Sequence, residues 1–186
     1  MVLIIAQKNN GTDPHQHGLF LLDAVVKRIY SDIHSYNILK NKNGKPSIAE
    51  LPDFHFNISH SGDWTVIAVS KAEIGVDIQY IKQIRRDLPR RFYTERENRY
   101  LDFVPLSDMN DSAIKMWSFK ESIAKAKGES LATLISKINT IEYDSTWITS
   151  LDGLYIQSIP FPDEKYVLVC ACFEKLENNY KLLILD

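Results

Sequence analysis

Apolar residues recur at helical spacing in three parts of the chain. Residues 15–30 place apolar side chains three and four positions apart and end in basic residues, which predicts an amphipathic helix. A second helix is expected to begin at the capping box of residues 94–97 and to end at Val104, before a proline. The third is predicted from about residue 112 to residue 127, and Gly128 is well placed to end it.

Alternating apolar and polar residues predict strands elsewhere. The clearest alternation is in residues 74–80, where large apolar side chains face one way and Asp77 and Gln79 face the other. A turn at residues 61–63 indicates a hairpin. Further strands are expected over residues 2–6, 54–58, 64–70, 140–143, 154–159, 166–173 and 181–185. Because helices come first and strands later, without regular alternation of the two, the predicted fold class is α+β.

The composition is that of an ordinary globular chain. Of the 186 residues, 45% are hydrophobic, and 22 basic residues against 24 acidic ones give a net charge of −2. This balance argues against disorder and against a general nucleic-acid-binding protein, which would carry a basic excess. The apolar runs at residues 2–6 and 166–172 are too short for a signal peptide and a membrane helix, respectively. We therefore expect a cytoplasmic protein without membrane association, in which Cys170 and Cys172 are reduced core thiols.

Asp77 stands within an apolar strand, where burial of its charge would be costly. It is a surface-facing aspartate, an aspartate satisfied by a neighbouring turn, or a ligand for a hard cation. For the last interpretation, Gly75 would let a ligand approach closely, and Gln79 offers a neutral oxygen on the same face of the strand.

Glu121 and Lys125 are four residues apart on the third predicted helix, in the order that favours a surface ion pair. Trp117 lies on the same stripe of the helix, however, and Lys120 adds a second cation beside it. A carboxylate and two ammonium groups near a metal ion would also suit the chemistry of anionic phosphates. Both interpretations are open on these residues alone.

Ser59 and His60 follow each other at the end of a predicted strand. No Gly-x-Ser-x-Gly elbow surrounds the serine, which argues against a hydrolase, and both side chains could donate hydrogen bonds to a phosphate. Lys45 lies in a turn and could do the same, although a solvated loop lysine is the default. His15 and His17 lack partners at zinc-ligand spacing, and the sequence contains neither a P-loop nor a dinucleotide-binding fingerprint.

Four short motifs follow one another along the chain: Gly-Lys-Pro at residues 44–46, Phe-Asn-Ile-Ser-His-Ser-Gly-Asp-Trp at 56–64, Gly-Val-Asp-Ile at 75–78, and Trp-Ser-Phe-Lys-Glu-Ser-x-x-Lys-x-x-Gly at 117–128. Together they resemble the surfactin-type 4′-phosphopantetheinyl transferases, over about residues 45–131. Members of that family transfer phosphopantetheine from coenzyme A to a serine of an apo acyl- or peptidyl-carrier protein. They release adenosine 3′,5′-bisphosphate and require magnesium (Mg2+).

The resemblance also implies a fold and a domain organisation. The fold would be a pseudo-dimer of two similar α+β halves, with coenzyme A bound in the cleft between them. We expect residues 1–72 to form the N-terminal half, which contacts the nucleotide of coenzyme A. Residues 73–186 would form the C-terminal half, with the metal site and the carrier-docking surface. A chain with two halves can form its own cleft, so we expect a monomer.

Individual site residues follow from the same resemblance. Asp77 and Glu121 resemble the magnesium ligands, and Glu121 also resembles the general base that takes the proton of the carrier serine. Gln79 departs from the family, which often has glutamate there, so we expect it to bind the metal poorly or to hold a metal-bound water. The remaining site residues are the lysines that neutralise the pyrophosphate, Lys120 and Lys125, and the contacts to the nucleotide end, Lys45, Pro46, Ser59 and His60.

Other interpretations concern the partners. The basic residues Lys82, Arg85, Arg86, Arg90 and Arg91 lie where relatives dock an acidic carrier protein, or they form a solvated basic face. A non-catalytic coenzyme A or carrier-binding module of the same fold is the alternative function. Gln79 favours that alternative, whereas the retained Asp77, Glu121 and Lys125 oppose it. A nucleic-acid-binding domain built on the basic stretch has little support from the near-neutral charge.

Overall fold

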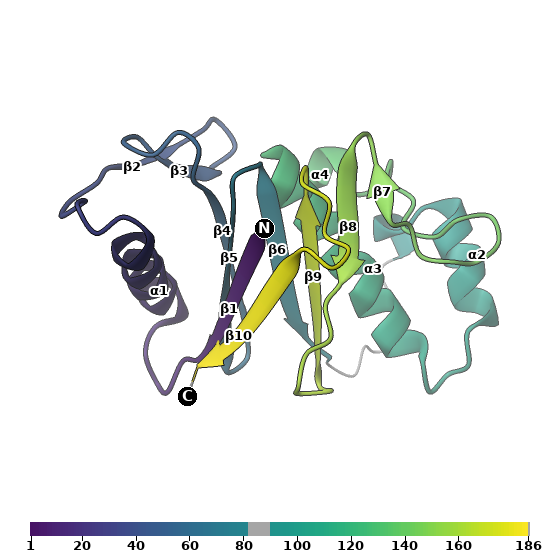
Figure 1. The fold of residues 1–186 in the computed structure, drawn as a ribbon. Helices are drawn as coiled ribbons and strands as arrows, with labels where there is room; N and C mark the ends of the chain where they lie inside the picture. Colours follow the sequence, from purple (N-terminus) through teal and green to yellow (C-terminus); the bar gives the residue numbers. More distant parts are fainter. Residues whose placement is uncertain (82–89, 186) are drawn as a thin grey trace.

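The structure is a computed structural model that describes residues 1–81 and 90–185. The described residues form two four-stranded sheets and one small two-stranded sheet (Figure 1). The first sheet has the strand order β10 (Tyr180–Leu185), β1 (Val2–Lys8), β5 (Trp64–Ser70), β4 (His55–Ser61). The second has the order β6 (Ile74–Tyr80), β9 (Tyr166–Cys172), β8 (Leu154–Ser158), β7 (Ser150–Leu151), and the small sheet pairs β2 (Ile38–Lys40) with β3 (Pro46–Ile48).

One long helix packs on each large sheet. The helix α1 (Pro14–Ile29) packs on the first sheet, and α3 (Met109–Lys127) packs on the second. Beside α3 lie α2 (Glu95–Phe103), the short α4 (Leu131–Leu134) and a 3-10 helix, η1 (Arg90–Phe92). This combination of helices with largely antiparallel sheets confirms the predicted α+β class.

The ends of the helices follow from local sequence. The Asp13 side chain caps α1 by accepting a hydrogen bond from the backbone N–H of Gln16, and α2 begins at the predicted capping box. Gly128 ends α3 with a φ angle of 63°, a left-handed conformation that favours glycine. The helix α3 begins at Met109, earlier than the expected residue 112, because its first turn lacks the apolar periodicity from which the start was predicted.

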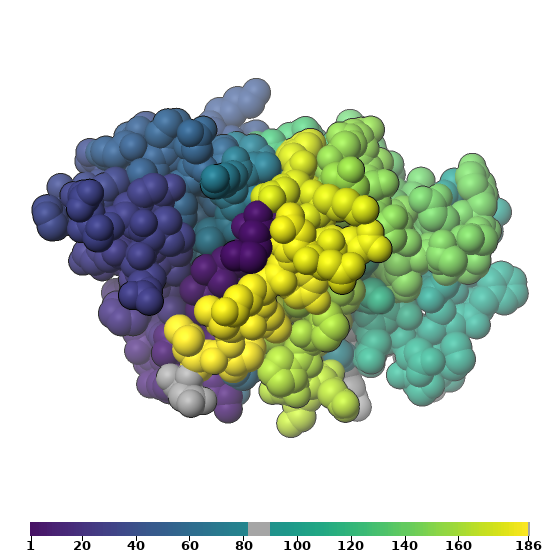
Figure 2. All heavy atoms as spheres, viewed as in Figure 1, coloured from purple at the N-terminus to yellow at the C-terminus, as the bar shows by residue number. Residues whose placement is uncertain are grey.

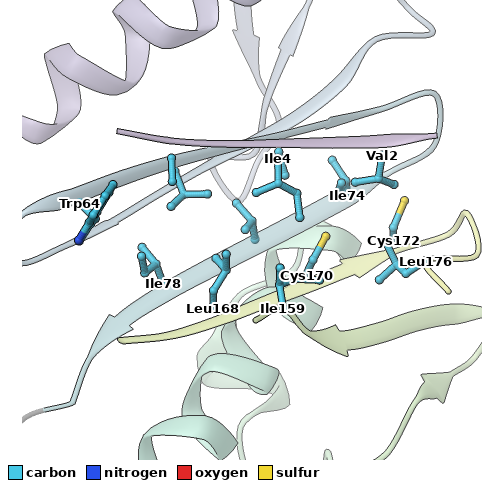
Figure 3. Packing of buried hydrophobic residues seen from close by; sticks show 14 of the residues in the cluster. Val2, Ile4, Trp64, Ile74, Ile78, Ile159, Leu168, Cys170, Cys172 and Leu176 are labelled. Atoms are coloured by element: carbon cyan, nitrogen blue, oxygen red, sulfur yellow. The ribbon is translucent and has the colours of Figure 1, made fainter. Parts of the chain in front are cut away.

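The inner faces of the two large sheets pack against each other. Their shared cluster of buried apolar side chains comes mainly from β1, β5, β6 and β9 and includes Ile4 and Leu168 (Figure 3). Cys170 and Cys172 lie in this cluster as free thiols, as predicted. Because alternate residues of a strand point to opposite faces, β6 buries its apolar side chains in this cluster, and Asp77 points to the opposite face of the sheet.

The strand β6 and the helix α3 approach each other closely at Gly75. A Cβ atom added to this glycine would lie 2.1 Å from the carbonyl oxygen of Ser122 and 2.4 Å from the backbone nitrogen of Ala126. Glycine is therefore required for the contact between strand and helix. The expectation that Gly75 leaves room for a ligand is wrong, because backbone atoms of α3 occupy that space.

The last strand returns to the first sheet. β10 pairs in parallel with β1, so that Val2 lies opposite Tyr180. In Figure 2 the yellow C-terminal segment lies between the blue and the green parts of this face of the molecule. The last strand of the chain thus completes the sheet that the first strand begins.

Most of the predicted strands are confirmed, with small shifts at their ends. The strand expected at residues 140–143 is an exception, since it is reduced to a single bridge between Ile141 and Trp147. The hairpin of β2 and β3 was not predicted, because each of these strands has three residues and shows no clear alternation. No helix in the described part of the chain is long and apolar enough to cross a membrane.

Candidate active site

A cavity of about 520 Å³ lies between α1, the β2–β3 hairpin, β4 and the C-terminal end of α3. Five of the side chains that line it carry an ammonium or an imidazole group: His15, Lys40, Lys45, His60 and Lys125. Leu19, Ile38 and Phe56 contribute apolar surface. Apolar walls with a few convergent ammonium and imidazole groups suit an anionic ligand that also carries an apolar or aromatic part.

Four of the predicted site residues line this cavity, namely Lys45, Pro46, His60 and Lys125. Three motifs that are far apart in the sequence therefore meet at one place. The sequence patterns do not single out Lys40, because basic residues are ordinary near turns. His15 reaches the cavity only because α1 docks beside β4, a tertiary contact that its local sequence does not reveal.

The turn between β2 and β3 is tied to the C-terminal end of α3. The side-chain amide of Asn43 donates to the Gly128 carbonyl at 2.8 Å, and Nζ of Lys45 donates to the Ala126 carbonyl at 2.6 Å. Lys45 also forms an ion pair with Glu73. These bonds satisfy carbonyl groups that lack partners within the helix, and they hold the two walls of the cavity together.

Asp77 is 1% exposed and forms an ion pair with Lys125, with Nζ at 2.7 Å from Oδ1. The same oxygen accepts a hydrogen bond from the Ser59 hydroxyl at 3.1 Å, and Oδ2 accepts one from the Gln79 amide at 3.1 Å. Nζ of Lys125 also donates to the Val76 carbonyl at 3.2 Å. The interpretation of Asp77 as a surface aspartate is wrong, since its buried charge is compensated by a lysine and two hydrogen bonds.

Glu121 lies one helical turn before Lys125 on α3 and is half-buried. Burial raises the pKa of its carboxyl group, the Asp77 carboxylate raises this pKa further, and the Lys125 ammonium opposes both effects. Lys125 forms its ion pair with Asp77 and not with Glu121. The interpretation of Glu121 and Lys125 as a surface ion pair is therefore wrong. Two carboxylates and one ammonium group thus lie close enough to interact, and Lys125 is the member of this group that lines the cavity.

Lys120 faces a different part of the molecule. Its side chain is fully buried, with Nζ at 2.6 Å from Oε2 of Glu97 and hydrogen bonds to the Phe92 and Ile135 carbonyls. Consecutive helical residues point about 100° apart, so Lys120 faces α2 whereas Glu121 faces the Asp77 side. The prediction that Lys120 neutralises the pyrophosphate is therefore corrected, because its charge is compensated by a buried carboxylate away from the cavity.

Ser59 and Gln79 lie beside Asp77, as the alternation along β4 and β6 leads one to expect. The Ser59 side chain is buried and is not among those that line the cavity, unlike that of its exposed neighbour His60. Gln79 turns its amide N–H toward Asp77 in the structure.

Three of the predicted carrier-docking residues, Lys82, Arg85 and Arg86, lie outside the described residues. Arg90 is exposed and pairs with Asp102 at 2.7 Å, and the exposed Arg91 stacks on the Phe92 ring. A docking role for the basic stretch stays a prediction.

The donor atoms near Asp77 fit a magnesium ion. Within the described ranges, no three His, Cys, Asp or Glu side chains gather into a metal site. Asp77 and Glu121 supply two carboxylates, and Gln79 could turn its amide oxygen toward them. Magnesium prefers oxygen ligands and commonly keeps several waters, so two carboxylates completed by water and substrate oxygens satisfy its requirements.

Comparison with known proteins gives the family. Residues 73–166 match the model of the 4′-phosphopantetheinyl transferase superfamily, and residues 17–72 match that of the N-terminal region of 4′-phosphopantetheinyl transferases. The chain belongs to the 4′-phosphopantetheinyl transferase superfamily, as its four ordered motifs indicated.

Several named relatives are similar over part of their length. The 4′-phosphopantetheinyl transferase Sfp of Bacillus subtilis is 36% identical over 116 residues, which are 62% of this chain and 52% of the relative. The transferase gsp of Aneurinibacillus migulanus is 37% identical over 152 residues, 81% of this chain and 59% of the relative. The transferase AcpT of Escherichia coli K12 is 30% identical over 123 residues, 64% of this chain and 60% of the relative. The chain thus spans about half the length of the curated relatives that it matches.

Proposed function

We propose that this protein transfers the 4′-phosphopantetheine group from coenzyme A to a serine hydroxyl of an apo carrier protein and releases adenosine 3′,5′-bisphosphate. One observation carries the proposal. Lys125, which lines a cavity together with further lysine and histidine side chains, forms an ion pair with Asp77, and the half-buried Glu121 interacts electrostatically with both. This arrangement suits a substrate with a nucleotide at one end and a pyrophosphate beside it, which is the group to be cleaved.

The reaction requires a base and compensation of charge. In the proposed step, a carboxylate oxygen of Glu121 accepts the proton of the carrier serine, and the serine oxygen forms a bond to the phosphorus that bears pantetheine. The bond from that phosphorus to the bridging oxygen breaks, and adenosine 3′,5′-bisphosphate leaves with the electron pair. Burial of Glu121 raises its pKa and so makes it a stronger base. Lys125 balances the charge of the pyrophosphate, which is the main demand of phosphoryl transfer.

Coenzyme A is proposed to bind with its nucleotide end in the cavity. Lys45, Pro46 and His60 line it and would contact that end, with Lys40 and His15 as further basic groups on its wall. Carboxylate oxygens of Asp77 and Glu121 would hold a magnesium ion, with the amide of Gln79 next to it or on one of its waters. When bound, this ion would supply additional positive charge to the pyrophosphate oxygens.

The organisation that we propose is a single chain with two halves, residues 1–72 and 73–186. The two family models, which meet at residues 72 and 73, support this division, although β10 returns to the first sheet. We propose a monomer, because one chain supplies every wall of the cavity. We also propose a cytoplasmic location, supported by the two buried free thiols.

The test is transfer itself. The purified protein would be incubated with coenzyme A, magnesium and a panel of apo acyl- and peptidyl-carrier proteins, and each carrier would be weighed by mass spectrometry. We expect at least one carrier to gain a single phosphopantetheine, and EDTA to stop the reaction. Glu121→Gln should lower turnover by roughly 10²–10⁴, the usual contribution of a general base.

A matched control is Lys127→Met, a change on the same helix at a lysine that pairs with the exposed Asp152. This variant should keep its turnover. If coenzyme A binds but no carrier is modified, the protein is instead the non-catalytic binding module that Gln79 favours.

A further inference from the structure

The open edges of the two large sheets meet in this fold. β4 is the last strand of the first sheet, β6 is the last strand of the second, and the two lie side by side (Figure 1). Among the described residues, no strand pairs with the outer edge of β6, so its backbone N–H groups there have no strand to donate to. Buried backbone donors need partners, so something else must accept these hydrogen bonds.

Side chains of β4 accept them in register. The Val76 N–H donates to Oδ1 of Asn57 at 2.9 Å, the Ile78 N–H to Oγ of Ser59 at 3.2 Å, and the Tyr80 N–H to Oγ of Ser61 at 2.9 Å. Each pair is separated by 19 residues. The polar face of β4 therefore replaces the carbonyl groups of a missing neighbouring strand and aligns the two sheets residue by residue.

The middle contact of the three has additional partners. The Ser59 hydroxyl donates to Oδ1 of Asp77 at 3.1 Å and accepts from Nζ of Lys125 at 3.2 Å, in addition to the Ile78 N–H. The Ser59 side chain is 5% exposed, and its one donor and two acceptor positions are all used. A single hydroxyl thus fixes the carboxylate, the ammonium group and the strand that carries the carboxylate.

We infer that Ser59 is a positioning residue. Its hydroxyl is held in place by the alignment of the two sheets, and it orients the side chains of Asp77 and Lys125 by hydrogen bonding. This inference rests on the proposed function and differs from the sequence-based expectation, in which Ser59 contacts the nucleotide. Hydrogen-bond partners that orient a metal-ligating side chain typically contribute 10- to 100-fold, and Asp77 is a proposed metal ligand, so a loss of about that size in turnover is expected when the hydroxyl is removed.

The experiment compares Ser59→Ala with Ser61→Ala. Each change removes one hydroxyl that accepts an N–H of β6, but Ser61 has no hydrogen bond to Asp77 or Lys125 among its described contacts. Ser61→Ala therefore measures the effect of losing one contact between the sheets. Turnover, the Michaelis constant for coenzyme A and the thermal unfolding midpoint are measured for the parent and both variants.

We expect both variants to unfold at similar temperatures, and Ser59→Ala alone to lose roughly 10- to 100-fold in kcat with little change in the Michaelis constant. A raised Michaelis constant with unchanged kcat would instead make Ser59 a nucleotide contact and overturn the inference. Equal losses of kcat in the two variants would overturn it too, because they would indicate a purely structural role.

If the proposed function is wrong, the parent protein itself transfers no phosphopantetheine, which distinguishes this case from failure of the inference about Ser59. The inference would then be decided by NMR of 15N-labelled protein. Hydrogen exchange at the Ile78 amide and at the Lys125 ammonium should be faster in Ser59→Ala than in Ser61→Ala. Unchanged exchange at both groups in Ser59→Ala would refute the positioning role.

Discussion

Replacing Lys120 by methionine tests whether this lysine supports the fold or contacts the substrate. In the folded protein, Oε2 of Glu97 accepts hydrogen bonds from Lys120 and the Thr94 N–H, and Oε1 accepts two from Thr140. Methionine fills a similar volume but removes the cation that pairs with this carboxylate. Leaving a buried charge without its partner costs about 3–5 kcal/mol, a large part of the 5–15 kcal/mol by which domains are usually stable, to order of magnitude.

Urea unfolding measures this loss directly. With a slope of about 2 kcal/mol per molar urea, a loss of about 4 kcal/mol lowers the midpoint by about 2 M. The matched control is Lys127→Met on the same helix, whose ion pair with Asp152 lies at the surface and contributes at most about 1 kcal/mol. The double variant Lys120→Met/Glu97→Gln should recover part of the loss, because it removes the buried unpaired charge.

A midpoint shift in Lys120→Met no larger than that of Lys127→Met would refute this reasoning. Normal stability combined with weakened coenzyme A binding would restore the original interpretation of Lys120 as a pyrophosphate contact. Burial lowers the pKa of Lys120 below its ordinary value of 10.5, although Glu97 opposes this effect, so the urea series is run at neutral pH and not at alkaline pH.

Two further predictions concern the carboxylate cluster. The pKa of Glu121 in the folded protein is raised above its ordinary value of 4.5. The free energy of unfolding should therefore decrease as the pH rises above 4.5 and this carboxyl group ionises. Glu121→Gln should therefore be more stable than the parent at pH 7 and similar to it below pH 4.5, and thermal unfolding across pH with equal midpoints at pH 7 would contradict this. Gln79→Glu places a third carboxylate beside Asp77, so it should lower the magnesium concentration for half-maximal activity, most clearly when coenzyme A is limiting. An unchanged magnesium midpoint would mean that residue 79 is not near the ion.

The elements with strong local signals could be predicted from the sequence. The capping box that begins α2, the glycine that ends α3 and the alternation along β6 depend on neighbouring residues alone. The parallel pairing of β1 with β10 joins the two ends of the chain, and no local pattern encodes it. The β2–β3 hairpin was missed for a related reason, since its short strands are held in place by α3.

Three of the motifs that the sequence singles out meet at one cavity, but the directions of their side chains could not be predicted. The motif of residues 117–128 contains Lys120 and Glu121, which are adjacent in the sequence and point to different parts of the fold. Their separation follows from helical geometry, but which of them faces the cavity depends on where α3 packs. The role of Gly75 also depends on where α3 packs, because the backbone of α3, and not a ligand, leaves no room for a side chain there.

The charges of Asp77, Glu121 and Lys125 explain why a neutral side chain such as that of Gln79 suits this site. Asp77, Glu121 and Lys125 together carry one negative charge in excess, and Asp77 is almost fully buried. A pyrophosphate placed beside them would add like charge in a partly desolvated place, which is unfavourable unless further cations arrive with it. Under the proposed function, a divalent cation that binds with coenzyme A would meet this need. A third carboxylate at position 79 would strengthen the binding of this cation, but it would also add to the negative charge of Asp77 and Glu121, whereas the neutral amide of Gln79 does not.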